Sequence, residues 1–401
     1  MKHLVLLSCL WVYIGSEYTS HDGLKTYEVY PQNQQQLEFL ITLVQNRGYD
    51  VRSISQVPGA PSTIMVAPAA QAHFVRILNK SNISHSVLTE NLENVLQVER
   101  SLQNQIEKSS EGIISFRQYQ RYNAIIAYLV KLSEIYPDIV SLEPPGITYE
   151  GRKVQAIKIG TRVLYLIQEL VEKSENRYMI EEVDWYIIPL LNPDGYEYSH
   201  EHERYWRKNR FPHKDIPGCV GVDLNRNFDL HWTSSARCNN DAYSGERPFD
   251  QKESQYLRDF VQRYSNNTKL YVTVHSFGNL ILYPWGYTKQ LPANAKELKE
   301  LSVKVRDAIA NKSGTGYLYG SISHFPGLGP VFGSSVDWVK GAAGVNLSYA
   351  IELPGRKYGF EVPPSEIINI CNETFEAFKT FHNYVQKKFG KRNMYYTNII
   401  S

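Results

Sequence analysis

The chain has 401 residues, of which 42% are hydrophobic and 21% are charged, and its formal net charge is +2. This length exceeds one typical domain and favours two. The composition fits an ordinary globular protein without long runs of one charge, so we expect neither a nucleic acid nor a membrane as a partner.

The first residues have the pattern of a secretory signal peptide. A basic residue, Lys2, precedes an apolar run over residues 4–14, and the small residues Gly15 and Ser16 follow. The apolar run is too short to span a membrane. We therefore expect residues 1–16 to be a signal peptide and the mature chain to be secreted.

The next part of the chain, residues 17–108, has the alternating and helical patterns of a small α/β domain. The patterns predict three strands and two helices, in the order strand 26–30, helix 34–46, strand 62–67, helix 69–78 and strand 86–88. A polar stretch over residues 97–110 follows, and it contains the basic residues Arg100 and Lys108. We expect this stretch to be an exposed linker open to proteolysis.

Residues 109–401 contain two basic segments that suit the binding of a carboxylate. Arg207 follows Tyr205 and Trp206, and Arg226 directly follows Asn225 where a short apolar run ends. A guanidinium beside an amide can bind a carboxylate through charge-assisted, bidentate hydrogen bonds. Either arginine alone would more often be a surface ion pair.

Two further polar residues stand at the ends of strand-like runs. His275 follows the β-branched and aromatic run 270–274, and Glu352 ends the apolar run 347–351. Loops at strand ends can aim such side chains into a cleft. A lone histidine there is usually structural, whereas a carboxylate in apolar surroundings is costly without a partner or a task.

Seven short motifs occur together and in one order. They are Asn192-Pro193-Asp194-Gly195, Tyr205-Trp206-Arg207-Lys208, Asp223-Leu224-Asn225-Arg226-Asn227, Val274-His275-Ser276, Tyr283-Pro284-Trp285-Gly286, Val336-Asp337-Trp338 and Ile351-Glu352-Leu353. In this order the chain resembles the zinc metallocarboxypeptidases, in particular their digestive A/B subfamily. The resemblance runs from about residue 27 to about residue 385.

The resemblance implies a role for each of six residues. His275 matches a zinc ligand, Glu352 the general base, Arg207 the oxyanion-stabilising arginine, Asn225 and Arg226 the pair that binds the substrate's terminal carboxylate, and Val336 the floor of the pocket for the C-terminal side chain. An apolar floor resembles A-type members, which remove aliphatic or aromatic residues. The implied substrates are the C-termini of peptides or proteins.

The resemblance also implies the architecture and the covalent features. We expect a mixed, eight-stranded-type sheet flanked by helices over residues 109–401, preceded by an α/β propeptide over residues 17–108 that a trypsin-like protease removes. Cys219 and Cys238 match a family disulfide, and we expect a monomer. Six N-glycosylation sequons begin at Asn79, Asn82, Asn266, Asn311, Asn346 and Asn372.

One departure from the family concerns the metal. The family carries a His-x-x-Glu zinc-ligand pair between its Tyr-Glu-Gly-Arg and Asn-Pro-Asp-Gly motifs, but residues 153–191 of this chain contain no histidine. The strand-like run 153–159 leads straight into the helix-like run 163–173. We therefore expect a sheet that lacks one central strand, doubtful zinc binding, and an inactive or impaired chain.

Two other segments bear on this departure. The single His-x-x-Glu in the chain, His200 to Glu203, lies after the Asn-Pro-Asp-Gly motif, where the family has an ordinary surface segment. The loop over residues 323–333, where the family places a mobile tyrosine, contains none. Three explanations stay open: a shortened product of a locus that otherwise encodes an active exopeptidase, a non-catalytic binder of peptide C-termini, or an active enzyme with unorthodox ligands.

Overall fold

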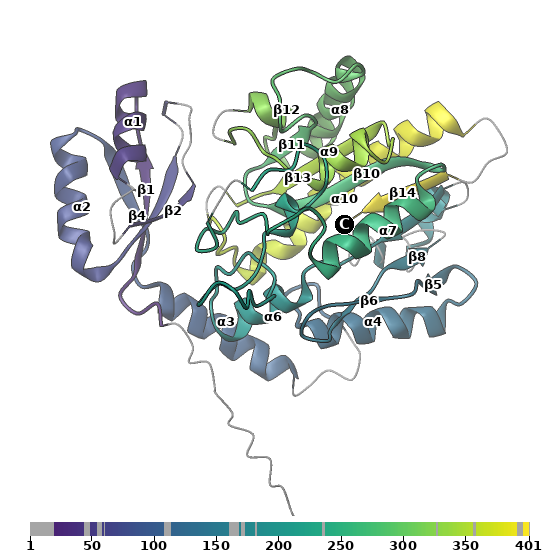
Figure 1. Cartoon of the computed structure of the whole chain (residues 1–401), viewed down its shortest axis with the longest axis horizontal. Helices are drawn as coiled ribbons and strands as arrows, with labels where there is room; N and C mark the ends of the chain where they lie inside the picture. Colours follow the sequence, from purple (N-terminus) through teal and green to yellow (C-terminus); the bar gives the residue numbers. More distant parts are fainter. Residues whose placement is uncertain are drawn as a thin grey trace, which may run out of the picture.

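The structure is a computed structural model of the whole chain. It describes residues 20–43, 49–53, 58–59, 61–107, 114–159, 168–169, 173–180, 183–234, 237–325, 328–355, 358–390 and 396–400. The proposed signal peptide and Lys108 lie outside these residues, as does most of the helix-like run 163–173. Figure 1 shows a small domain at one end, joined through helix α3 to a larger α/β domain.

The small domain is an antiparallel sheet covered by two helices. The strand order is β2-β3-β1-β4. Val29, Leu40, Ile64 and Phe74 are fully buried between the sheet and the helices. The elements are β1 (Lys25–Tyr30), α1 (Gln34–Leu43), β2 (Tyr49–Ser53), β3 (Ser62–Val66), α2 (Pro68–Lys80) and β4 (Ser84–Thr89). Apart from β2, each element falls where the sequence predicts one.

Helix α3 (Leu92–Glu107) covers most of the stretch over residues 97–110, where we expected an exposed linker. Residues 97, 98 and 101 of this helix are exposed, so the stretch is exposed as expected but helical. Leu92 and Leu96 are buried on one side of this helix against Met65 and Tyr205. An apolar pair at i and i+4 gives a polar helix a face to bury, and tertiary packing then outweighs the polar composition. Arg100, one of the two candidate cleavage points, bonds Glu93 within this helix.

The large domain has an eight-stranded mixed sheet in the order β12-β11-β13-β10-β14-β9-β8-β5. Its strands are β5 (Val140–Leu142), β8 (Ile157–Ile159), β9 (Val183–Ile187), β10 (Thr268–Ser276), β11 (Leu280–Tyr283), β12 (Leu318–Ser321), β13 (Leu347–Leu353) and β14 (Tyr396–Ile400). A separate hairpin pairs β6 (Gly146–Ile147) with β7 (Lys153–Val154). The α/β fold class predicted from the sequence is confirmed.

Helices bury both faces of this sheet. Leu129, Leu301 and Phe381 pack on one face with Trp185, and Phe260 packs on the other face. The helices are α4 (Tyr122–Ile135), α6 (Pro193–Glu201), α7 (Lys252–Tyr264), α8 (Ala295–Ser313), α9 (Ser335–Gly341) and α10 (Pro364–Phe389), with 3-10 turns η1 (Ser174–Ile180), η2 (Leu224–Arg226) and η3 (Ile322–His324). Helices on both faces explain why the middle residues of the central strands β10 and β13 are buried.

The expectation of a sheet with one central strand missing is wrong for the described structure. β14, which follows the last helix, lies between β9 and β10 and pairs in parallel with both. An empty slot there would leave two rows of buried N–H and C=O groups without partners, which is costly. The sequence signal for β14 is a short run of mixed polarity, so only the vacancy in the sheet explains its position.

Candidate active site

His275 and Glu352 meet at the carboxyl ends of two neighbouring parallel strands. β10 and β13 pair over seven residues, and in this register His275 lies opposite Glu352. Their runs of buried apolar residues fix the register, because a slip by one residue would exchange the two faces of the strand. The sequence placed each residue at a strand end, and the structure brings the two together.

The two arginines are positioned by one buried carboxylate. The Nε atom of Arg207 donates to Asp223 Oδ2 at 2.9 Å, and Arg226 Nη1 lies 3.7 Å from the same oxygen. Asp223 also caps the 3-10 turn η2, where its Oδ1 accepts from the Asn225 amide at 3.0 Å. One carboxylate therefore orients both guanidinium groups and begins the turn that carries Asn225.

Asn225 and Val336 belong to the same wall of the site. The Asn225 Oδ1 atom accepts from the Ser335 amide at 2.9 Å at the start of α9, which leaves the side-chain NH₂ as the group available to a ligand. Val336, the next residue, is almost fully buried in the apolar cluster below. It is not among the residues that line the adjoining cavity. Its role as a pocket floor stays a prediction.

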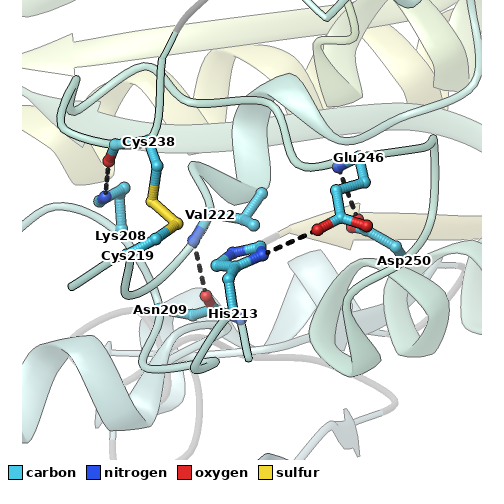
Figure 2. Close-up of a disulfide and its surroundings, with 8 residues drawn as sticks. All are labelled: Lys208, Asn209, His213, Cys219, Val222, Cys238, Glu246 and Asp250. Atoms are coloured by element: carbon cyan, nitrogen blue, oxygen red, sulfur yellow. Dashed lines mark hydrogen bonds and ion pairs between the residues drawn. A yellow bond between two sulfur atoms is a disulfide. The ribbon is translucent and has the colours of Figure 1, made fainter. Parts of the chain in front are cut away.

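A disulfide braces the loop that presents these groups. Cys219 and Cys238 are bonded, as the resemblance implied, at a sequence separation of 19. Figure 2 shows the surrounding contacts: Lys208 Nζ donates to Cys238 O at 2.6 Å, and the Val222 amide donates to Asn209 Oδ1 at 2.9 Å. Closing a loop of this size stabilises a fold by roughly 3 kcal/mol in the chain-entropy model.

Two cavities open at this edge of the sheet. The first, of about 260 Å³, is lined by Arg207, Asp223, Asn225, His275 and Ser335, but not by Glu352, Arg226 or Val336. Its other lining residues are Ile188, Pro189, Leu190, Leu191, Asn192, Leu224, Phe228, Thr273 and Val274. The second, of about 650 Å³, shares Asn192, Arg207 and His275 and is also lined by Glu99 of α3. The site is thus a concave region with a few convergent polar groups.

Burial strongly shifts the pKa values of the ionisable groups in the site. Burial raises the pKa of Glu352 to about 7, an effect that Arg207 and Arg226 partly offset. Burial, together with the nearby Arg207, lowers the pKa of His275 to about 4. Burial would raise the pKa of Asp223, but Arg207 and Arg226 hold it below its usual range. At neutral pH His275 is therefore uncharged, and the two arginines carry the positive charge of the site.

The described residues do not fit a catalytic zinc ion. Such an ion takes three protein ligands and leaves one position open. In the described ranges, the one group of three His, Cys, Asp or Glu side chains with ligand atoms within 4.8 Å is His213, Cys219 and Cys238. The two cysteines are joined in the disulfide, and His275 is not in the group.

The His-x-x-Glu segment does not complete a metal site either. His200 lies in the last turn of α6, stacks edge-on against Tyr196 and lines the larger cavity. Glu203 lies 3.2 Å from His21 Nε2 in the small domain.

Sequence reasoning also missed Asp223 as a positioning residue. Its signal was the placement of an acidic residue two positions before the Asn225-Arg226 pair, which is typical of a cap.

The small domain contacts the rim of the larger cavity. Arg204 Nε donates to Glu99 Oε2 at 3.2 Å, and Arg204 Nη2 donates to the Phe360 carbonyl at 3.3 Å. Glu361 accepts from Tyr205 on one side and from Thr89 of β4, at 2.9 Å, on the other. These contacts hold α3 at the cavity, which Glu99 lines, and tie β4 to the segment that contains Glu361. In the described part of the chain, no helix combines the length and apolarity that a membrane span needs.

Comparisons with known proteins agree with these observations. A family described as zinc carboxypeptidase matches residues 161–377, and one described as carboxypeptidase activation peptide matches residues 27–99. Carboxypeptidase B of Astacus astacus is 34% identical over 306 residues, which cover 69% of this chain and 100% of that protein. Zinc carboxypeptidase A 1 of Anopheles gambiae is 30% identical and covers 91% of this chain and 90% of its own.

A solved structure shows the same architecture. The crystal structure of the carboxypeptidase A from Helicoverpa armigera superposes with a TM-score of 0.80 at 30% identity, over 93% of this chain and 99% of the other. Relatives named A and relatives named B both match, so the comparisons leave the preferred C-terminal residue open. With an activation peptide before its catalytic-type domain, the chain belongs to the zinc carboxypeptidase family.

Proposed function

We propose that this chain is a secreted member of the family that binds free peptide C-termini and hydrolyses them poorly or not at all. The observation that carries this proposal is the contrast within one site. Two guanidinium groups are anchored for a carboxylate by Asp223, whereas the described residues provide no metal-ligand set beside His275.

The binding step needs only groups of this chain. Arg226 and the side-chain NH₂ of Asn225 would bind a terminal carboxylate with charge-assisted donors, and Arg207 would add a second cation near Asp223. The side chain of the last peptide residue would extend toward Val336, and the apolar floor would favour aliphatic or aromatic residues over Lys or Arg. In a relative with a full ligand set, zinc would supply an activated water, and the residue that matches Glu352 would accept its proton.

The small domain fits the part of an activation segment. Its Glu99 lines the larger cavity and bonds Arg204, its Thr89 bonds Glu361, and it precedes residues 108–113, which include Lys108. We propose that a trypsin-like protease cleaves in this region and uncovers the site. Arg100 is the poorer candidate for cleavage because it lies within α3 and bonds Glu93.

A binding experiment tests the proposed function. Peptides ending in Phe, as the free acid, are titrated into the trypsin-treated chain and into its Arg226→Ala variant. Arg226→Ala should weaken binding by about 1.5–3 kcal/mol, the range for hydrogen bonds to charged groups. The matched control is Arg306→Ala, which removes an exposed arginine that bonds its neighbour Asp307. Equal losses in the two variants would contradict the proposal.

A further inference from the structure

The central strand β14 comes later in the sequence than both of the strands between which it lies. β9 ends at Ile187 and β10 begins at Thr268, yet the strand between them is Tyr396–Ile400, which follows α10. It pairs in parallel with β9 over five residues and with β10 over four. Figure 1 shows this strand, in yellow, inside the sheet beside the green β10.

β14 links two parts of the sheet that no other described strand joins. The second edge of β9 is paired with β8, and the second edge of β10 is paired with β13. Without β14 the sheet would divide into β5-β8-β9 and β12-β11-β13-β10. The facing edges of β9 and β10 would then form a slot, open to one extended segment, with unpaired backbone donors and acceptors on both sides.

The residue types of β14 match this slot less well than its backbone pairing does. Ile399 is fully buried, and it pairs in register with Tyr186 and Tyr271 in one apolar cluster. The register position of Asn398, in contrast, lies between Trp185 and Leu270, both of which are fully buried. An amide residue at such a position is a poor choice for a central strand. The sequence of β14 is therefore not optimised for the slot that it occupies.

We propose that the edges of β9 and β10 form a strand-binding slot for which residues 396–400 are the ligand, and that this ligand binds reversibly. Backbone ladders on two sides supply the affinity, as in strand addition to an exposed sheet edge, and Ile399 supplies the one apolar anchor that the structure describes. The same sequence then enters the slot as a separate peptide as well as in its own chain.

The slot also controls the site, because it separates the two strands that carry the smaller cavity. Ile400 pairs with Ile187 and with Val272, and the next residues of those neighbours, Ile188 and Thr273, line the cavity. An occupied slot fixes the spacing between these two lining segments, which belong to different halves of the sheet.

A strand-exchange experiment on the full chain tests the proposal. A site-specific protease sequence is inserted between Gly390 and Tyr396, the folded chain is purified intact, and the insert is then cut. A fluorescent peptide with the sequence of residues 395–401 is added in excess. We expect the labelled peptide to enter the cut chain stoichiometrically and to remain bound through gel filtration, while the uncut chain takes up none.

The matched control is the same peptide with Asn398→Pro. In a strand paired on both sides every backbone N–H is used, so a proline removes a ladder bond and should abolish uptake. Equal uptake of the two peptides, or uptake by neither, would overturn the proposal. Uptake by the uncut chain at the same level would also overturn it, because the label would then be bound elsewhere.

A second variant needs no cleavage. In the intact chain, Asn398→Val places a β-branched apolar residue at the register position between Trp185 and Leu270, and it should raise the denaturation midpoint. A lowered midpoint would contradict the assigned register. Neither experiment measures the binding of peptide C-termini, so the slot can be established or refuted independently of the proposed function.

Discussion

At the residue scale, the site depends on Asp223, which the sequence motifs did not single out. Arg207, Asn225, Arg226, His275 and Glu352 could be selected from a linear pattern because each belongs to a motif of distinctive residues. The shared contact to Asp223 could not be predicted in the same way, since it depends on how η2 turns back toward residue 207. Side-chain chemistry is visible in a sequence, whereas its mutual orientation needs the fold.

Asp223→Asn should destabilise the protein. The substitution leaves two guanidinium groups beside each other without the carboxylate that neutralises them, and breaking a buried ion pair by removing one partner is costly. Because Arg207 is partly exposed, with 41% of its side chain accessible, we expect a loss of about 1–3 kcal/mol. Urea denaturation measures it, and an unchanged midpoint would show that Asp223 does not anchor the arginines.

His382 provides a second prediction at this scale. Its side chain is fully buried, stacks on Trp185 with ring centroids 6.1 Å apart, and has no hydrogen-bond partner for either nitrogen in the described structure. Burial lowers its pKa from 6.5 to about 4. The unfolded chain therefore binds more protons between these values, and the free energy of unfolding falls as the pH drops below about 6.5.

His382→Phe should remove this dependence and keep the aromatic packing. We expect the variant to gain stability over the unmodified chain, and to gain more at pH 5 than at pH 8. Thermal denaturation at the two pH values measures the gain, with His73→Phe as a control at an exposed position on α2. A gain of the same size at both pH values would show that protonation of His382 is not the cause.

At the scale of elements, local patterns predicted most of the fold and failed where tertiary partners decide. The strands with alternating or apolar runs, such as β1, β10 and β13, were predicted because their sequences define which face is buried. α3 and β14 were not, because a polar helix and a mixed strand gain their stability from Met65 and Tyr205 in one case, and from the slot between β9 and β10 in the other.

The turn before α9 provides a test at this scale. Gly333 has φ of +66°, and a Cβ atom there would lie 2.3 Å from the Arg226 carbonyl oxygen. Gly333→Ala should displace the η2 turn, reduce stability by more than about 1 kcal/mol and weaken carboxylate binding. Gly316→Ala, where a Cβ meets nothing within 4 Å, is the matched control. Similar effects of the two substitutions on binding would contradict the role given to this turn.

At the scale of the whole molecule, the chain keeps the architecture of its family and brings Arg207, Asn225 and His275 to one cavity, and the described residues offer no three-ligand metal group beside His275. The sequence predicted the family and its architecture, since the motifs identify the family, whereas doubtful zinc binding and the roles of the site residues stay predictions. It did not predict that the sheet would be closed by a strand from after α10, because strand order depends on pairing across the molecule.

Zinc binding should accordingly be weak. One imidazole supplies a small part of the affinity of a three-ligand site, so zinc added to the mature chain should be lost on dialysis against a mild chelator. Metal content is measured after dialysis, with an intact member of the family treated in parallel. Stoichiometric zinc retained by this chain would mean that it holds the ion with other ligands.

The central claim is that carboxylate binding survives without hydrolysis, and one measurement addresses it directly. Isothermal titration calorimetry of the activated chain compares a Phe-terminated peptide as the free acid with the same peptide as the C-terminal amide, and mass spectrometry of the recovered sample, with zinc present, detects any shortened product. The account predicts clear binding of the free acid, poor binding of the amide and no shortened peptide. Equal binding of both peptides, or release of the terminal residue, would contradict it.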